Sequence, residues 1–253
     1  MNPSNAELGS RHVRAYFVEV VMPSYQRFIK YYVGTEFGLG EDLRNANDTA
    51  AALLHLGDRI YREIGNFSAE FVNPTEYRRS LFRKCKAYAI VSDVGLVSKH
   101  GSIDRGEGYV RSSSAITENI AIDRYKDKYG VYFRYRKLLE ITFCENQGAD
   151  LGRLLLDSMK FLSQELKRLA VIPALPLIDK PLPLFVTRAS KGRQPKFRYL
   201  GLVGEYVEWG HKIFFYRNDS RLLSPMRPGD EIGGRPEVKY EAKVSPSPFD
   251  QPV

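Results

Sequence analysis

The sequence is poor in cysteine, the residue from which disulfide frameworks and many zinc sites are built. Its 253 residues include two cysteines, Cys85 and Cys144, which are far apart and form no C-x-x-C pair. This excludes a disulfide scaffold and argues against a cysteine-based zinc site. Reduced thiols are typical of the cytoplasm, which is the location we expect.

Long apolar runs are also missing. No stretch reaches the roughly 18 uninterrupted apolar residues of a membrane-spanning helix, and residues 1–14 contain no apolar secretion segment. The 20 glycines are too few for a collagen-like chain, and 43% apolar residues are too many for a disordered one. The sequence therefore predicts a globular protein without a membrane segment, built as one large domain or as a medium domain with an appendage.

Acidic residues are in the minority, and the excess positive charge is clustered. The chain has 38 Lys and Arg against 30 Asp and Glu, a net charge of +8. Three clusters carry most of the excess: residues 78–86, 124–137 and 185–200. Aromatic residues interleave with the last two clusters, including Tyr125, Tyr132 and Phe197. This pattern favours an anionic partner such as RNA, whose backbone is neutralised by cations and whose bases stack on aromatic rings.

The candidate nucleic-acid-binding residues are Arg105, Arg188, Lys191, Arg193, Lys196 and Arg198. All are basic, and the last five fall in a stretch, residues 185–200, that contains no acid. The alternative interpretation is a solvated edge strand, where basic side chains prevent strand-to-strand aggregation.

Apolar residues at three- and four-residue spacing predict four helical regions. They span residues 11–32, disturbed by Pro23; 42–64; 74–100, with a break near Cys85; and 150–169. Asn73 and Asp150 are suited to cap the third and fourth regions, and Gly101 provides a left-handed exit after His100.

The remaining segments predict strands and a proline-rich linker. Residues 114–123 and 131–144 have strand character on either side of a polar turn. Four prolines in residues 172–185 predict an extended linker, residues 185–215 two or three short strands, and the last 30 residues a largely irregular tail. The expected organisation is a helical body over 10–170 with a hairpin over 114–144, a linker with short strands over 171–223, and a tail over 224–253.

Two groups of polar residues are candidates for chemistry. At the end of the third helical region, Asp93, Lys99 and His100 lie within two turns, and a histidine there is favoured in its charged form by the helix dipole. On the second region, Asn45, Asp48, His55 and Asp58 are spaced to follow one stripe. Capping cations and a solvated or core histidine are the structural alternatives. His55, Asp58, Asp93 and His100 also include suitable metal ligands, but at no characteristic spacing.

These two groups carry a resemblance to a known family. The alanine-rich helix with Leu54-His55-Leu56-Gly57-Asp58, followed by the helix that ends in Lys99-His100-Gly101, resembles bacterial HEPN-like proteins over about residues 10–170. The resemblance implies an α+β fold, mainly α: a HEPN-like helical bundle with an inserted β-hairpin and a small C-terminal β appendage. Many HEPN proteins are metal-independent ribonucleases of toxin–antitoxin, stress-response and phage-defence systems, and many form homodimers.

The chain departs from the HEPN ribonuclease motif at one position. That motif has an arginine, a gap of four to six residues and a histidine, whereas the positions before His100 hold Asp93, Val94 and Gly95. His100 corresponds to the motif histidine, and Lys99, Arg105 or a basic residue of the 78–86 segment would replace the arginine. In this interpretation His100 is the base, Lys99 stabilises the charge that develops on phosphate, and Asp93 or Asp58 orients an imidazole. Neither a metal nor another cofactor is needed.

Two other functions remain open at this stage. The missing arginine and the proline-rich C-terminal third are compatible with a non-enzymatic helical module that binds a protein partner through the C-terminal segment. A nucleotide- or small-molecule-binding bundle is the third interpretation, with His55 and His100 lining a shared pocket.

Overall fold

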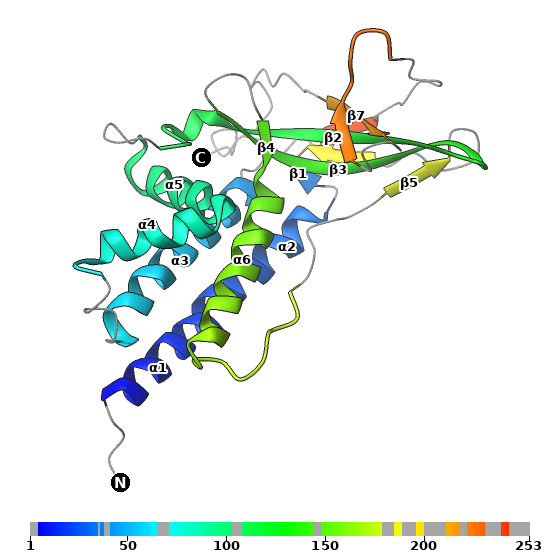
Figure 1. Ribbon diagram of the computed structural model, residues 1–253. Coiled ribbons are helices and arrows are strands. Elements are labelled where there is room, and N and C mark those ends of the chain that lie inside the picture. The colour runs from blue at the N-terminus through cyan, green and yellow to red at the C-terminus, as the bar shows by residue number, and fades with distance from the viewer. Residues whose placement is uncertain are drawn as a thin grey trace, which may run out of the picture. The chain divides into compact units, whose positions relative to one another are not determined.

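The chain folds into two compact units (Figure 1). In the computed structural model, residues 5–34, 36–37, 41–64, 71–102, 108–143, 148–178, 185–188, 196–199, 211–217, 222–230 and 239–242 are described. The first unit comprises Met1–Ile29, Leu43–Thr117 and Leu139–Pro181, and the second Lys30–Asp42, Glu118–Leu138 and Leu182–Val253. The predicted α+β class is confirmed.

Helices dominate the first unit. They are α1 (Asn5–Tyr16), a π-helical turn (Phe17–Val21), α2 (Met22–Tyr32), α3 (Glu41–Ile64), α4 (Pro74–Lys84), α5 (Lys86–His100) and α6 (Leu151–Arg168). Helix α5 packs against both α4 and α6. The core consists of fully buried apolar side chains from several helices, among them Phe17, Leu53, Ile60, Leu81, Val94 and Leu162.

The disturbance predicted at Pro23 is a π-helical turn. Proline has no N–H, so the α-helical hydrogen bond from residue 23 to the carbonyl of Glu19 cannot form. The preceding residues adopt the wider register, in which the N–H of Met22 donates to the carbonyl of Phe17. The helix therefore continues through Pro23 instead of ending there.

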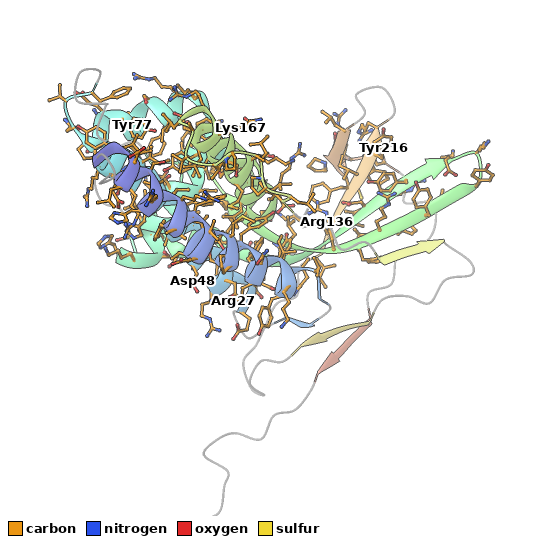
Figure 2. All side chains as sticks on the ribbon, turned by 90° about the horizontal axis from the view of Figure 1, so that it is seen from below. Arg27, Asp48, Tyr77, Arg136, Lys167 and Tyr216 are labelled. Carbon is orange, nitrogen blue, oxygen red and sulfur yellow. The ribbon has the colours of Figure 1, made fainter. Side chains whose placement is uncertain are left out.

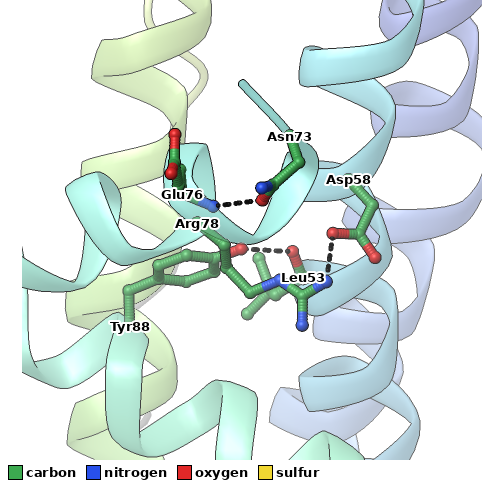
Figure 3. A network of polar contacts seen from close by, with 6 residues as sticks. All are labelled: Leu53, Asp58, Asn73, Glu76, Arg78 and Tyr88. Carbon is green, nitrogen blue, oxygen red and sulfur yellow. Dashed lines mark hydrogen bonds and ion pairs between the residues drawn. The ribbon is translucent and has the colours of Figure 1, made fainter. Parts of the chain in front are cut away.

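Side chains at the helix ends explain where α4 and α5 begin. The Asn73 side chain accepts a hydrogen bond from the N–H of Glu76 at 3.0 Å, and Pro74 occupies the first turn of α4 (Figure 3). Cys85 then interrupts the helix with an extended backbone and caps α5 through its sulfur. The predicted caps and the break near Cys85 are confirmed.

Helix α3 lies in the middle of close helix contacts. A Cβ atom on Gly95 of α5 would lie 3.0 Å from the carbonyl carbon and oxygen of Ala50, so the two backbones meet directly. Further along, the Tyr88 hydroxyl lies over Gly57 and donates to the carbonyl of Leu53 at 3.4 Å (Figure 3). Because of this packing, the candidate site residues that the sequence identifies on α3 and α5 are held on rigid helices.

A mixed sheet is built around one long hairpin. Strands β2 (Ile116–Asp127) and β3 (Gly130–Thr142) are joined by a tight turn, and the sheet order is β4-β3-β2-β7-β8. β7 (His211–Arg217) runs parallel to β2, and β8 (Leu222–Pro225) antiparallel to β7. β4 (Gly148–Asp150) and β5 (Phe185–Arg188) both pair antiparallel with β3.

A second, smaller sheet has three strands in the order β1-β6-β9, and both of its strand pairs are parallel. They are β1 (Glu36–Phe37), β6 (Lys196–Tyr199) and β9 (Lys239–Ala242). The strands expected after residue 185 therefore exist, but β5 and β7 extend the hairpin sheet instead of forming an independent appendage. The division of the chain at residue 170 stays a prediction.

None of the described helices combines the length and the apolar character that crossing a bilayer requires.

A buried ion pair fixes the second unit from inside. The Lys137 ammonium on β3 donates to Oδ2 of Asp42 at 2.6 Å and to the carbonyl of Tyr31 at 2.7 Å. The side chains of Lys137 and Asp42 are only 6% and 5% exposed. Burial raises the pKa of the Asp42 carboxyl, and the nearby ammonium opposes that shift. The pair attaches the end of α2 and the start of α3 to the middle of the hairpin.

We predict that Lys137→Met destabilises the protein by about 3–5 kcal/mol, because it leaves Asp42 buried without its cation. The double variant Lys137→Met/Asp42→Asn should lose less, since the uncompensated charge is then removed. Urea unfolding of both variants measures the coupling. Lys126→Met, an exposed position on β2, is the control and should change stability by less than about 0.5 kcal/mol.

Candidate functional site

The α5 exit is the first candidate region. Gly101 has a φ of 76°, and its N–H donates to the carbonyl of Val97 at 2.7 Å. This left-handed residue ends the helix as predicted. Lys99 and His100 are exposed in the last turn, where the helix dipole favours positive charge.

The chain folds back on this exit and adds a second basic residue. The N–H of Ser113 donates to the carbonyl of Gly101 at 3.4 Å, and Ser102 and Ser112 form an isolated antiparallel bridge. Because of this bridge, the backbone of Arg111 and the following serines lies beside the end of α5. Arg111 is exposed. The sequence reasoning missed it, although an arginine followed by three serines directly before a strand is a recognisable polar cluster.

Asp93 is directed at a loop rather than at a histidine. Its carboxylate accepts the N–H of Tyr109 at 2.7 Å and also the N–H of Val110. Burial raises the pKa of this carboxyl, and the two backbone hydrogen bonds oppose the shift. Asp93 therefore anchors the loop that returns to the α5 exit. Within the described residues, Asp93 contacts no histidine, so no contact supports the expectation that it orients an imidazole.

His55 and Asp58 lie elsewhere, in an open pocket between α1 and α3. The pocket has a volume of about 500 Å³ and is lined by Tyr16, His55, Asp58, Arg59, Arg62 and Glu63. Asp93, Lys99 and His100 are not among these lining residues. Asp58 is engaged by α4, since Arg78 Nη2 donates to its Oδ1 at 2.8 Å (Figure 3). The structure thus divides the five catalytic candidates between the α5 exit and this pocket.

The polar stripe expected on α3 is also divided. Asn45 is buried, with 1% of its surface exposed, whereas Asp48 and His55 are exposed. In the described part of the chain, no three His, Cys, Asp or Glu side chains are grouped so that they could hold a metal ion.

The nucleic-acid-binding candidates are only partly placed. Arg105, Lys191 and Arg193 lie outside the described residues, and Lys196 and Arg198 are positions of β6. Arg188 is the last residue of β5 and is in register with Tyr132 of β3.

A row of three tyrosines crosses the hairpin sheet at this point. Tyr125 of β2 stacks on Tyr132 of β3, with ring centroids 5.2 Å apart and planes 9° apart, and on Tyr216 of β7 at 5.2 Å and 23°. All three side chains are half-buried. Neighbouring strands are about 4.8 Å apart, so rings on three adjacent strands stack on one another in this way. We call Tyr125, Tyr132 and Tyr216 the tyrosine row.

Arginine side chains border the tyrosine row. The Arg134 guanidinium lies 4.5 Å from the ring centroid of Tyr125 and 5.9 Å from that of Tyr132. Arg136 lies 5.8 Å from the ring of Phe214 and donates to the buried Asp123 at 3.2 Å. Burial, and secondarily the Asp123 charge, raises the pKa of the Tyr125 hydroxyl. The result is an aromatic surface with the Arg134 guanidinium fixed beside it.

Sequence reasoning found part of this surface. Tyr125, Tyr132 and Arg134 belong to the predicted basic and aromatic cluster over residues 124–137. Tyr216 was missed, although Lys212, Phe214 and Tyr216 alternate with apolar residues in the pattern of a strand.

We predict that Asp93→Asn loosens the loop without disrupting α5. Loss of the carboxylate acceptor should make the Tyr109 and Val110 amides exchange with solvent roughly 10- to 100-fold faster, since hydrogen bonds to charged groups contribute about 1.5–3 kcal/mol. Hydrogen exchange followed by NMR measures this. Asp157→Asn, at a partly exposed carboxylate on α6, is the control, and unchanged protection in Asp93→Asn would show that the loop is held otherwise.

Comparisons with known proteins leave the resemblance of residues 10–170 to HEPN-like proteins as a proposal. No family model matches the chain, and no match is found among curated proteins or solved structures.

Proposed function

We propose that the protein is a HEPN-like RNA-associated protein that binds single-stranded RNA on the face of the tyrosine row. The observation that carries the proposal is the stacking of Tyr125, Tyr132 and Tyr216 beside the Arg134 guanidinium. Stacked aromatic rings and neighbouring cations suit a chain of unpaired bases joined by phosphates. The net charge of +8 favours the same class of partner.

The proposal assigns each group of this surface to one part of the RNA. Within the row, Tyr125 is covered by a ring on each side, so Tyr132 and Tyr216 are the rings left for contact with bases, beside their in-register neighbours Arg188 of β5 and Leu223 of β8. Arg134 is held against two rings and keeps its charge for a phosphate. Lys212 is exposed on β7, in register with Ala121 and on the face of the row, and supplies a second cation.

We predict that Tyr132→Leu weakens binding of a single-stranded RNA oligonucleotide by about 5- to 150-fold, because one base–aromatic stack is lost. Arg134→Gln should weaken binding across sequences and reduce the dependence of affinity on salt by about one phosphate contact. Fluorescence anisotropy at several salt concentrations measures both effects.

The matched control for Arg134→Gln is Arg153→Gln on α6. Arg153 has a side chain that is 76% exposed, and its loss removes the same charge from a surface outside the row. Equal losses in the two variants would indicate a general charge effect and contradict a site at the row. Absence of salt-sensitive RNA binding by the unmodified protein would refute the proposal.

RNA cleavage at the α5 exit is a second candidate function. It is favoured by one observation: the Ser102–Ser112 bridge brings the backbone of Arg111 beside Lys99 and His100. The backbone next to Arg111 also lies at Asp93, one of the positions where the HEPN motif would have its arginine, because Asp93 accepts the N–H groups of Tyr109 and Val110.

The chemistry of this candidate requires no metal. His100 accepts the proton of a ribose 2′-hydroxyl, whose oxygen attacks the adjacent phosphorus. The bond from phosphorus to the 5′-oxygen breaks, and that oxygen takes a proton from Lys99 or water. The products are a 2′,3′-cyclic phosphate and a 5′-hydroxyl, and Lys99 and Arg111 stabilise the negative charge of the transition state.

We predict that the protein cleaves single-stranded RNA in EDTA and that His100→Ala lowers the rate by about 100-fold or more, since general base catalysis contributes about 10²–10⁴-fold. Arg111→Gln should also lower the rate, whereas His55→Gln should not. Gel analysis of end-labelled RNA, with identification of the cyclic phosphate, measures the products. Cleavage that persists in His100→Ala would assign the activity to another site or to a contaminant.

A further inference from the structure

The pocket between α1 and α3 is not used by either proposed function. Its volume of about 500 Å³ is within the range of about 300–1,000 Å³ that is common for small-molecule sites. The walls come from α1 through Tyr16 and from α3 through the remaining lining residues, which include three basic side chains, His55, Arg59 and Arg62.

Close contacts fix the two helices around this pocket. Gly9 of α1 lies directly against the backbone of Glu63, where a Cβ atom would collide with the carbonyl oxygen. One turn before Glu63 on α3, the Arg59 guanidinium lies 4.5 Å from the ring centroid of Tyr16 on α1. The π-helical turn begins at the next residue, Phe17, and such turns occur frequently at functional sites.

The carboxylates of the pocket already have cationic partners. Glu63 pairs with Arg59 at 2.7 Å and with the His12 imidazole at 3.5 Å. Asp58 pairs with Arg78 of α4 at 2.8 Å. Oε2 of Glu63 accepts no hydrogen bond within the described residues, but neither Glu63 nor Asp58 forms a hydrogen bond or ion pair with Arg62 or His55 there.

Two groups stay available to a ligand. Within the described residues, Arg62 and His55 have no hydrogen-bond or ion-pair partner. They are seven residues apart on α3, two turns or about 10 Å along the helix axis. A ligand that reaches both must carry an anionic group at one end and a hydrogen-bonding group at the other.

We infer that this pocket binds a nucleoside monophosphate. Arg62 holds the phosphate, as guanidinium groups do through paired hydrogen bonds. The sugar and base lie along Tyr16 and the Arg59 guanidinium that covers it, and His55 contacts a polar edge of the base. The same chemistry exists as a free mononucleotide and as the 5′-phosphorylated end of an RNA chain.

Titration calorimetry with AMP, GMP, CMP and UMP tests the inference on the full-length chain. At least one of the four should bind with a Kd below about 1 mM, and adenosine should bind at least about 10-fold more weakly than AMP because it lacks the charged group. A 5′-phosphorylated tetranucleotide, titrated in parallel, distinguishes a free nucleotide from an RNA end by which of the two binds more tightly.

Two substitutions locate the site. Arg62→Gln and His55→Gln should each weaken nucleotide binding by about 10-fold or more, and both residues are exposed, so the fold should persist. Arg27→Gln, at an exposed arginine on α2 (Figure 2), removes the same charge outside the pocket and should change the Kd by less than about 2-fold.

Three outcomes would overturn the inference: no binding of any monophosphate or of the tetranucleotide at about 5 mM, which is fivefold above the expected Kd limit; equal binding of adenosine and AMP; or equal losses in Arg62→Gln and Arg27→Gln. Arg134→Gln should leave mononucleotide binding unchanged. A failure of RNA binding on the sheet is thereby distinguishable from a failure of this pocket.

Discussion

The buried ion pair between Lys137 and Asp42 is the constraint on which the hairpin depends. A lysine that is nearly inaccessible to solvent is tolerated only where its charge is matched, and Asp42 together with the Tyr31 carbonyl meets that need. These partners lie about a hundred residues earlier in the sequence. Lys137 therefore fixes which face of β3 turns inward.

The alternation of side chains along β3 then determines which residues lie on the opposite face of this strand. Phe133 and Tyr135 share the side of Lys137 and are buried, so Tyr132, Arg134 and Arg136 lie on the opposite side. The face with Tyr132 is the one that holds the tyrosine row. A single-residue register shift would exchange the two sets, burying Arg134 and exposing Phe133. The internal ion pair and the proposed RNA surface are thus two results of one register.

Local signals in the sequence predicted most helices and strands, whereas the arrangement of the candidate sites depends on contacts between residues far apart in the sequence. Asn73, Asp150 and Gly101 act on their own neighbours, so their capping roles could be derived from the sequence and are confirmed. The partners of Asp58 and Asp93 come from other segments, Arg78 and the Tyr109 loop, and no spacing reveals them. The stacking of Tyr216 on Tyr125 likewise depends on a parallel strand pairing across a long connection, which the sequence does not reveal.

Arg136 and Lys137 show how a basic cluster in the sequence can mislead. Such a cluster suggests a charged surface, whereas both of these side chains are buried and paired with acids.

The distribution of these pairs bears on function. Asp42, Asp58, Asp93 and Glu63 are all engaged by cations or backbone amides, so they are poorly suited to act as catalytic bases. In the described part of the chain, the side chains of Lys99, His100, Arg111 and Arg62 are exposed and have no such partner. Exposed basic groups on a chain with a net charge of +8 attract anions. On such a surface the general base must be a histidine, because guanidinium and ammonium groups stay protonated at neutral pH and so cannot accept a proton. His100, which lies beside Lys99 and the backbone of Arg111, is therefore the decisive residue for the proposed cleavage, and anion binding is the property that would remain without it.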